Sequence, residues 1–476
     1  MKGSAAGGGT GNAGCGLIGE VTAGGIVAQI GPASNAADYK LSNCHNHGEV
    51  DIRAWMAAGN GTGFDLGGAV GYCGVPVENV SNNGKVTIES KGAFVRAGGI
   101  IGKAAYAASN LTNNGEVTFK GIRTSGTKQI GSELSFGGVI GYTSKTLTEA
   151  KNTGKCTFAV NTIDSAAQLR AGGIVGDHSA TVSGTNEGEI IVTPGGSNIL
   201  IVGGIAGYTK AQNLTYDGCV NKGPITVNSN VKISNQVFVS GILGRVEAYA
   251  SGKQNGISFT GCQNSGTITI DVPLGTSEGS NSNLSGISSS SDQSQNITDC
   301  TNTGDLVSNM PCSQMRVGGI AGYNGGSSKC SGCSVDCDIT LSAAITTMNV
   351  GGMVGYSNPG KYVGCTYNGK ISVVSGGYIG GILGYTKTNQ TMEGCKVDAE
   401  ITYGANTYAG LFIGSSEAGK TYTLGTAAKP CQIVSGSKVG STTVTALNDA
   451  TDASGVLVGR KNAVTVNAEN TSVVAE

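Results

Sequence analysis

Short segments of alternating apolar and polar residues recur along the chain and predict β-strands. In one clear example Val86 and Ile88 alternate with Lys85 and Thr87, and β-branched residues fill many equivalent positions. A period of two residues is strand spacing, and β-branched side chains are typical of strands. No segment has a sustained apolar stripe at helical spacing, so we expect few helices.

Two motifs alternate along the chain and recur together about every 35 residues. The first motif reads G-G-I-V-G-Y, and its twelve copies begin at Gly24, Gly67, Gly98, Gly137, Gly172, Gly203, Ser240, Ser285, Gly318, Gly351, Gly380 and Ala409. The second motif reads C-x-N-x-G-x-I-T-V and is clearest from Cys44, Cys219, Cys262 and Cys300. Self-similarity at such a fixed period is typical of repeat architectures.

The pattern predicts an all-β protein, a parallel β-solenoid or β-helix with one coil per repeat and about 12 to 13 repeats. Residues 15–22 resemble the second motif with no first motif before it, so we expect residues 1–23 to be a partial repeat and the chain to be truncated upstream. Residues 24–408 would form the solenoid, and residues 409–476 degenerate repeats with a C-terminal cap. The Ser- and Asn-rich residues 275–296 are expected to be a mobile surface loop.

Three sequence columns test whether the repeats stack in register. Asn46, Asn82, Asn113, Asn152, Asn186, Asn221, Asn264 and Asn302 share one position and would form a ladder of amides. At an outward position Lys85 and Lys155 each fall between acidic residues of adjacent repeats, as favourable pairing requires, with Asp305 beside Asp338 as an exception. The Asn and Gly of the second motif are expected to be turn residues, of the kind that tolerate positive φ.

Composition and charge exclude several classes of protein. The 476 residues include 81 glycines and carry 30 basic and 31 acidic side chains, a net charge of −1. Such a balance supplies no basic field for nucleic acid. The eight prolines show no collagen period, and no apolar run is long enough to span a membrane.

Candidate chemistry is sparse. Most of the 14 cysteines lie in a motif column that indicates core packing by free thiols, with disulfides as the alternative. Cys330, Cys333 and Cys337, and the Cys44, His45 and His47 cluster, have metal-like spacing, but each overlaps the repeat frame, so we expect no metal and no cofactor. The best candidates for catalytic pairs are Asp177 with His178 and Asp51 with Arg53. Neither is a convincing catalytic set, so we expect no enzyme.

Tyrosines follow the glycine motif in several repeats. Tyr323, Tyr356 and Tyr385 lie in consecutive repeats, so stacking would align them as an aromatic ladder. Such a ladder could bind sugar rings or a partner protein, but the favoured interpretation is a purely structural stack that closes a coil corner. Arg96, Arg170 and Arg316 precede the motif in non-adjacent repeats and predict no stripe.

The paired motifs resemble the GLUG-type glycine-rich repeats of bacterial surface and secreted adhesins over most of residues 15–408. The resemblance implies extracellular or cell-surface display and binding or spacing, and it implies no catalytic residues. The leading hypothesis is therefore a non-catalytic adhesin, stalk or spacer whose partner is a glycan or a surface protein of a host or neighbouring cell. The alternatives are a carbohydrate-active β-helix, such as a polysaccharide lyase or depolymerase, and a glycan-binding module.

Overall fold

The computed structural model describes residues 21–31, 38–55, 63–91, 94–122, 133–161, 168–196, 199–247, 256–277, 280–326, 328–358, 360–374, 376–447, 455–460 and 464–475. These residues belong to two compact units. Unit 1 comprises Met1–Ala211 and Val220–Gln236, and unit 2 comprises Gln212–Cys219 and Val237–Glu476. Most of the expected partial repeat, residues 1–20, lies outside the described residues.

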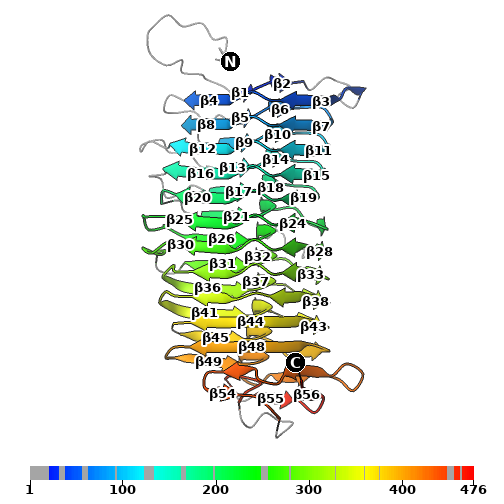
Figure 1. Ribbon diagram of the computed structural model, residues 1–476, viewed down its shortest axis with the longest axis vertical. Coiled ribbons are helices and arrows are strands. Elements are labelled where there is room, and N and C mark those ends of the chain that lie inside the picture. The colour runs from blue at the N-terminus through cyan, green and yellow to red at the C-terminus, as the bar shows by residue number, and fades with distance from the viewer. Residues whose placement is uncertain are drawn as a thin grey trace, which may run out of the picture. The chain divides into compact units, whose positions relative to one another are not determined.

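Unit 1 is a stack of coils in which each coil adds one strand to sheet A, one to sheet B and two to sheet C (Figure 1). Sheet A contains β1 (Val21–Gly24), β5 (Gly63–Gly67), β9 (Phe94–Gly98), β13 (Glu133–Gly137), β17 (Gln168–Gly172) and β21 (Ile199–Gly203). Sheet B contains β2 (Val27–Ile30), β6 (Val70–Cys73), β10 (Ile101–Ala104), β14 (Ile140–Thr143), β18 (Val175–His178) and β22 (Ala206–Thr209). Sheet C contains β3 (Leu41–Asn46), β7 (Val77–Asn82), β11 (Ala108–Asn113), β15 (Leu147–Asn152), β19 (Val182–Asn186) and β24 (Val220–Asn221), followed in the same coils by β4 (Val50–Trp55), β8 (Val86–Lys91), β12 (Val117–Ile122), β16 (Cys156–Asn161), β20 (Ile190–Pro194) and β25 (Ile225–Asn228).

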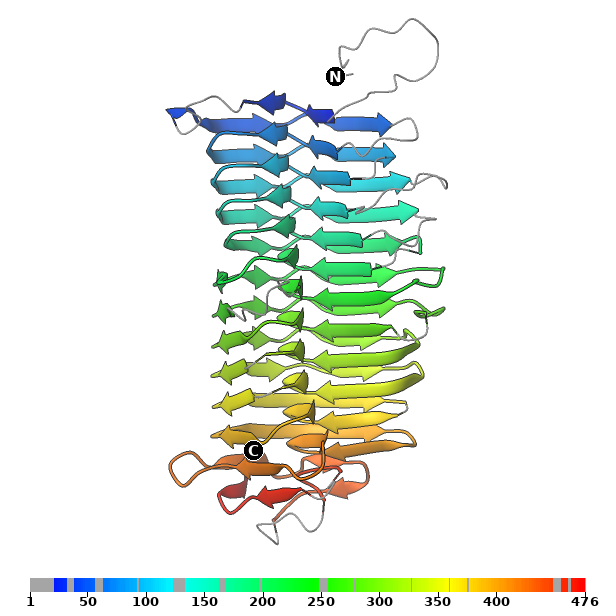
Figure 2. The same ribbon diagram turned by 180° about the vertical axis from the view of Figure 1, so that it is seen from behind.

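Unit 2 repeats this plan with a further strand in each coil, which belongs to sheet D and comes after the sheet B strand and before the sheet C strands along the chain. Figure 2 shows the stacked coils from behind. Its sheet A contains β26 (Gln236–Ser240), β31 (Asn281–Ser285), β36 (Cys312–Gly318), β41 (Ile345–Gly351), β45 (Gly377–Gly380) and β49 (Thr407–Gly410). Its sheet B contains β27 (Leu243–Val246), β32 (Ser288–Ser291), β37 (Ala321–Asn324), β42 (Val354–Ser357), β46 (Leu383–Thr386) and β50 (Ile413–Ser416). Sheet D contains β23 (Thr215–Asp217), β28 (Ile257–Thr260), β33 (Gln295–Thr298), β38 (Ser328–Ser331), β43 (Gly360–Val363), β47 (Gln390–Glu393), β51 (Thr421–Leu424) and β55 (Thr465–Asn467). Sheet C contains β29 (Gln263–Asn264), β30 (Ile268–Asp271), β34 (Thr301–Asn302), β35 (Leu306–Ser308), β39 (Ser334–Asp336), β40 (Ile339–Leu341), β44 (Thr366–Val373), β48 (Lys396–Tyr403), β52 (Cys431–Val434), β53 (Lys438–Val439), β54 (Thr442–Thr443) and β56 (Thr471–Val474).

The predicted fold class is confirmed: the described elements are all strands, and they pair in parallel and in register as a β-solenoid. Val86, for example, pairs with Val117, and Val117 pairs with Cys156 one coil further on. Identical repeat positions therefore stack directly, because each coil advances by one strand spacing. The exception is β53 with β54, an antiparallel pair within residues 409–476.

The predicted asparagine ladder is also confirmed. Asn82 Nδ2 donates to Asn113 Oδ1 at 2.8 Å, and the same contact joins Asn113 to Asn152, Asn152 to Asn186 and Asn186 to Asn221 in unit 1. In unit 2 Asn264 donates to Asn302 at 2.6 Å. Beyond Asn302 the same row carries Val335, Tyr367 and Val397, so an apolar row replaces the amides.

Among the described residues, the asparagines of the second motif do not have positive φ, and of its glycines only Gly369 does, at 142°. Asn82 Nδ2 also donates to the carbonyl of Gly84, so the side chain itself holds the turn. Gly84 is needed for space, since a Cβ there would overlap the carbonyl oxygen of Gly48 in the preceding coil. The left-handed residue instead precedes the cysteine position, at Asn43, Asn79, Asn110, Glu149, Gly261, Asp299, Gly332, Gly364 and Gly394.

The Ser- and Asn-rich residues 275–296 are not a loop insertion, and that expectation is wrong. They supply β31, β32 and the start of β33, and they complete one coil of unit 2. Ser282, Ser285, Ser288 and Ser291 are buried in this coil at positions where other coils bury apolar or other small residues. Sequence composition resembled a loop because this coil is built from small polar side chains.

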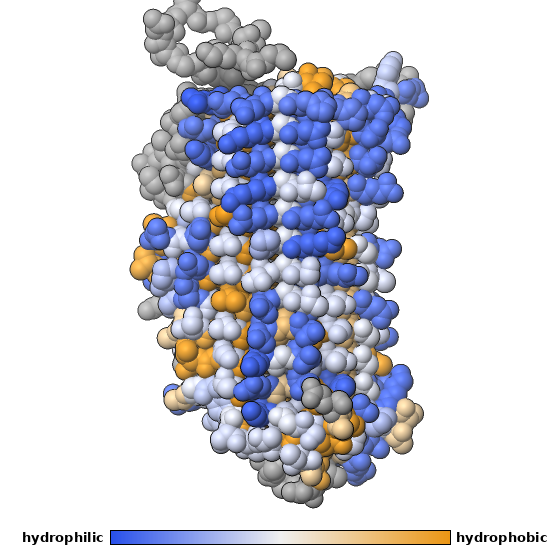
Figure 3. Space-filling view, in the orientation of Figure 1, coloured by the Kyte–Doolittle hydropathy of each residue, from blue (hydrophilic) through white to orange (hydrophobic). Residues whose placement is uncertain are grey.

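The charged column on sheet C pairs as stacking predicts. Lys85 Nζ lies 3.7 Å from Glu116, Lys155 lies 2.9 Å from Glu189, and in unit 2 Lys370 lies 3.4 Å from Glu400. Asp305 and Asp338 are accommodated because each carboxylate accepts the backbone N–H of the next coil, at 2.9 and 2.8 Å. Figure 3 shows hydrophilic side chains in columns along the stacking direction on one face. Exposed pairs of this kind add little stability, about 0–1 kcal/mol each.

The cysteine column lies in the core of unit 2. Cys219, Cys262, Cys300, Cys333, Cys365, Cys395 and Cys431 are buried, and no disulfide joins them. Thiols of consecutive coils are in hydrogen-bonding contact, as between Cys262 and Cys300 and between Cys365 and Cys395. In-register side chains point the same way, so the column packs as small apolar residues, as the sequence predicted.

Candidate functional site

Sheets A and B meet at the glycine motif, where their backbones touch. A Cβ on Gly102 of β10 would lie 2.6 Å from the backbone carbon of Asp65 on β5. A Cβ on Gly99 would lie 2.9 Å from Cγ of Asn113, so the second glycine of the pair packs against the asparagine ladder. The two sequence motifs are therefore coupled in space, and the corner between the sheets leaves no room for a side chain at Gly99 or Gly102.

Two outward rows of side chains flank this corner. Row A comprises the sheet A residues two positions before the glycine pair, and row B the sheet B residues seven positions further along the chain. In unit 1 row A contains Asp65, Arg96, Ser135, Arg170 and Ile201, and row B contains Tyr72, Lys103, Tyr142, Asp177 and Tyr208. In unit 2 row A contains Phe238, Asn283, Arg316, Asn349, Tyr378 and Tyr408, and row B contains Arg245, Ser290, Tyr323, Tyr356, Tyr385 and Ser415.

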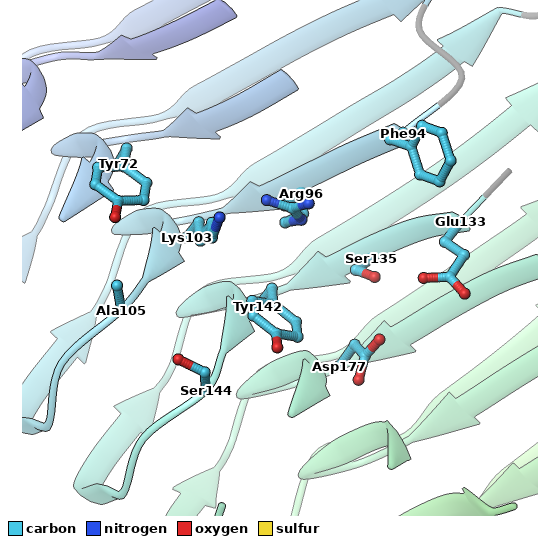
Figure 4. A pocket seen from close by; sticks show the side chains of 10 residues that line it. All are labelled: Tyr72, Phe94, Arg96, Lys103, Ala105, Glu133, Ser135, Tyr142, Ser144 and Asp177. Atoms are coloured by element: carbon cyan, nitrogen blue, oxygen red, sulfur yellow. The ribbon is translucent and has the colours of Figure 1, made fainter. Parts of the chain in front are cut away.

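In unit 1 the two rows line a pocket of about 480 Å³ (Figure 4). The Arg96 guanidinium lies 5.4 Å from the Tyr142 ring and donates to Asp65 at 3.1 Å. Lys103 lies over the Tyr72 ring at 5.2 Å. Aromatic faces, cations and carboxylates thus meet in one open site, and each cation there has an aromatic or acidic neighbour.

One end of this pocket is closed by a buried ion cluster. Arg170 is 2% exposed, donates to Asp177 and to Glu133, and lies over the Tyr208 ring at 3.8 Å. Burial raises the pKa of Asp177 to about 6, although the Arg170 charge opposes this shift. The cluster satisfies its own charges, so its chemistry is that of a structural support.

The structure does not assemble either candidate catalytic pair. Asp177 faces the pocket, whereas His178 is 1% exposed in the core, because neighbouring strand residues point to opposite faces. Asp51 and Arg53 form an exposed 3.4 Å ion pair on β4. Neither pair places a base and a second functional group together in a pocket.

Buried His178 should make the protein sensitive to acid. Burial lowers the pKa of His178 to about 4 from 6.5. The unfolded chain therefore binds the extra proton first, and the free energy of unfolding falls as pH drops from 6.5 to 4, by about 3 kcal/mol. The raised pKa of Asp177 acts in the opposite direction between about 6 and 4, because there the folded state binds the extra proton.

We expect His178→Thr to remove the acid-sensitive contribution. Thr143 and Thr209 occupy the same row in the adjacent coils, so threonine fits the site. Urea denaturation at pH 7 and pH 4.5 measures the effect. Between pH 7 and pH 4.5 the free energy of unfolding of the variant should rise by about 2–3 kcal/mol relative to that of the parent. An equal pH dependence of the two proteins would contradict a buried neutral His178.

The predicted tyrosine ladder is present in unit 2. Ring centroids are 5.2 Å apart for Tyr323 and Tyr356, and 5.6 Å apart for Tyr356 and Tyr385. Row A extends the ladder sideways, since Tyr378 stacks on Tyr385 at 5.2 Å and on Tyr408 at 6.1 Å. We name Tyr323, Tyr356, Tyr378, Tyr385 and Tyr408 the tyrosine patch. Tyr408 is 44% exposed and Tyr356 only 8%, so the patch has an open end and a covered end.

Arginines border the tyrosine patch. The Arg316 guanidinium lies 4.5 Å from the Tyr323 ring and 5.1 Å from the Tyr356 ring. At the other end Arg460 lies 5.1 Å from the Tyr408 ring and donates to the Tyr378 hydroxyl at 3.2 Å. Sequence reasoning missed this arrangement because it compared each arginine only with other arginines. The seven-residue spacing across the glycine pair, from Arg316 to Tyr323, is the signal that would have found it.

The metal-like clusters are dispersed. Cys333 lies in the thiol column, whereas Cys330 faces Ile297 and Tyr362 on sheet D, and Cys337 accepts from Asn302 Nδ2 at 3.1 Å. In unit 1 His45 is hydrogen-bonded to Ser81 at 2.8 Å, and His47 accepts from Asn83 at 3.3 Å. No group of three potential metal ligands occurs among the described residues.

Comparisons with family models, with curated proteins and with solved structures find no match to this chain. The fold and the two rows define the class of protein as a parallel β-solenoid with an aromatic and cationic surface beside its glycine corner. In the described ranges no helix is both apolar enough and long enough to cross a bilayer.

Proposed function

We propose that the chain is a bacterial surface-displayed or secreted repeat protein that acts as an adhesin, stalk or spacer and has no catalytic role. The tyrosine patch is the observation that carries the binding part of this proposal. Its rings stack coil upon coil, so one surface carries a continuous row of aromatic side chains along the stacking direction. The resemblance to GLUG-type repeats supports extracellular display.

The spacer role is supported by the way in which each coil is attached to the next. A coil of unit 1 is held by in-register backbone pairing on three sheets and by one buried asparagine contact. Because every coil buries its faces against its neighbours, stability grows with the number of coils. This construction suits a protein that carries a binding surface away from an anchor.

Glycan binding is the more specific candidate, because stacked tyrosines bordered by arginines suit pyranose rings and their polar groups. A polysaccharide lyase or depolymerase has weaker support. Its candidate residues, Asp177 with His178 and Asp51 with Arg53, do not converge in a pocket. A glycan-depolymerisation screen in which activity is lost on Asp177→Ala would favour the enzyme instead.

Localisation of the full-length protein tests the display part. Intact cells would be labelled with an antibody against the solenoid and treated with protease before fractionation. We expect labelling of intact cells, or recovery from the medium, and loss of the protein on protease treatment. Recovery only from the cytosol would refute display.

Binding is expected to depend on the tyrosine patch. Tyr356→Ala combined with Tyr385→Ala should weaken glycan binding at least tenfold, because about 1 kcal/mol or more is lost with each stacking face. A glycan array and titration of its best ligand measure this effect. Tyr39→Ala is the matched control, since Tyr39 is 60% exposed in unit 1, and thermal unfolding checks that the variants fold. Unchanged binding by the double variant would rule out the patch.

A further inference from the structure

One coil of unit 2 interrupts the rows of large side chains beside the glycine corner. Its row residues are the small polar Asn283 and Ser290. On one side they pair with Phe238 and Arg245, and on the other with Arg316 and Tyr323. The coil of Asn283 and Ser290 therefore lies between a coil that carries Arg245, beside Ser290, and a coil that carries Arg316, beside Asn283. We name Asn283, Ser290, Arg245 and Arg316 the Asn283 site.

Several buried polar atoms at the Asn283 site have no hydrogen-bond partner among the residues that the structure describes. Both the nitrogen and the oxygen of the Asn283 amide lack one, although this residue is only 1% exposed. The Nε atoms of Arg245 and Arg316 lack a hydrogen-bond partner as well. So does Oδ1 of Asn349, which follows Arg316 in row A, one coil further on. Buried polar groups in folded proteins are nearly always paired, so a cluster of unpaired groups points to a ligand that would pair them.

The two guanidinium groups are held by rings and not by acids. The Arg245 guanidinium lies 4.8 Å from the Phe238 ring. The Arg316 guanidinium stacks on the Tyr323 ring and donates a hydrogen bond to Gln314 Oε1 at 3.0 Å. In the described part of the chain neither arginine makes an ion pair with a carboxylate. Asp292 is the acid whose charge acts on Arg316, and its side chain is exposed. Burial lowers the pKa of Arg316. Two partly buried cations on the coils before and after Asn283, without a carboxylate partner in the described residues, favour an anion at this coil.

Unit 1 provides the internal contrast. Arg96 and Arg170 occupy the same row A position, and each is neutralised by acids of its own unit: Asp65 for Arg96, and Asp177 with Glu133 for Arg170. The row therefore pairs its arginines where the chain supplies a carboxylate. At the Asn283 site the chain supplies an amide in place of an acid, so the pairing groups must come from outside.

We propose that the Asn283 site binds the carboxylate or sulfate group of an acidic sugar, with the adjoining tyrosine patch holding the sugar rings. The forked guanidinium groups of Arg245 and Arg316 match an oxyanion, and Asn283 Nδ2 supplies a third donor on the coil between theirs. Both arginines are partly exposed, so a ligand can reach them from solvent. This inference rests on the proposed glycan-binding function and names its ligand class.

The test uses the purified full chain and three pairs of probes on a binding sensor. The pairs are oligogalacturonate and its methyl ester, sialyllactose and lactose, and a chondroitin sulfate hexasaccharide and its desulfated form. We expect at least tenfold tighter binding of a charged member over its uncharged partner. Preference within the galacturonate or sialyllactose pair assigns a carboxylate, and preference within the chondroitin pair assigns a sulfate.

Two variants and a control identify the site. Asn283→Asp places a carboxylate beside Arg316, on the coil between those of the two arginines, so it should weaken charged-probe binding at least tenfold while leaving the melting temperature equal or higher. Arg316→Gln should weaken the same binding at least tenfold, and Arg53→Ala, an exposed arginine on β4, should not.

Equal binding of charged and uncharged probes, or charged-probe binding retained in both site variants, would overturn the proposal. Neutral glycans bound through the tyrosine patch alone would also overturn it, although the proposed function would stand. A cytosolic protein whose charged-probe binding is lost in the variants would refute display and leave the site intact.

Discussion

Replacing Asn152 by leucine is expected to lower the free energy of unfolding by about 4 kcal/mol. The Asn152 amide donates to Asn186 Oδ1 at 2.8 Å and to the carbonyl of Gly154 at 2.9 Å, and its oxygen accepts from Asn113 at 2.8 Å. Leucine has a similar size but can make none of these contacts. Its neighbours would be left with buried polar atoms that cannot reach water, at about 1–3 kcal/mol for each group.

Urea denaturation followed by circular dichroism measures this loss. Asn114→Leu is the matched control, because Asn114 also bonds to its counterpart in the preceding coil, Asn83, but on the exposed surface. The control should change stability by less than about 1 kcal/mol. A loss below 1 kcal/mol for Asn152→Leu, or equal losses for the two variants, would show that the buried ladder does not stabilise the stack.

Gly138→Ala is expected to cost more than about 4 kcal/mol and to leave little folded protein. A Cβ at this position would overlap the carbonyl oxygen of Gly173 in the next coil. It would also lie 2.9 Å from Cγ of Asn152 and 2.9 Å from Sγ of Cys156. The nearest obstacle is backbone, so relief requires separating two coils that are paired along three sheets.

Gly63→Ala distinguishes a spatial effect from the general effect of replacing glycine in a strand. A Cβ at Gly63 would have its nearest described neighbour at 3.9 Å, so that variant should keep its stability within about 1 kcal/mol. Thermal unfolding and the yield of soluble protein report on both variants. A folded Gly138→Ala protein with an unchanged melting temperature would refute the close packing of the corner.

The fold could be predicted from the sequence because its repeats are in register. A column such as Asn82, Asn113 and Asn152 is informative only if equivalent positions lie side by side, and the hydrogen bonds among these residues show that they do. The tyrosine ladder followed from the same reasoning. Position within one repeat was therefore a reliable guide to contacts between repeats.

Contacts within one coil were harder to predict, because they depend on how the chain bends at its corners. The sequence indicated turn residues that tolerate positive φ at the Asn and Gly of the second motif, whereas the recurring left-handed residue lies just before the cysteine position, as at Asn110 and Gly364. The meeting of Arg316 with Tyr323 depends on the fold of the glycine corner. The coil at residues 275–296 was misassigned because serine and asparagine are common in loops, yet here they fill buried positions.

The distance between residues 51 and 226 tests the in-register stacking of unit 1 most directly. Asp51, Thr87, Thr118, Thr157, Ile191 and Thr226 form one continuous row. Spin labels on ketone-bearing amino acids at Asp51 and Thr226 leave the 14 native cysteines untouched, and pulsed electron–electron resonance measures their separation. Five strand spacings predict a narrow distribution near 24 Å, at about 4.8 Å for each spacing. A broad distribution, or a maximum beyond about 40 Å, would contradict the stacking of consecutive repeats as neighbouring coils.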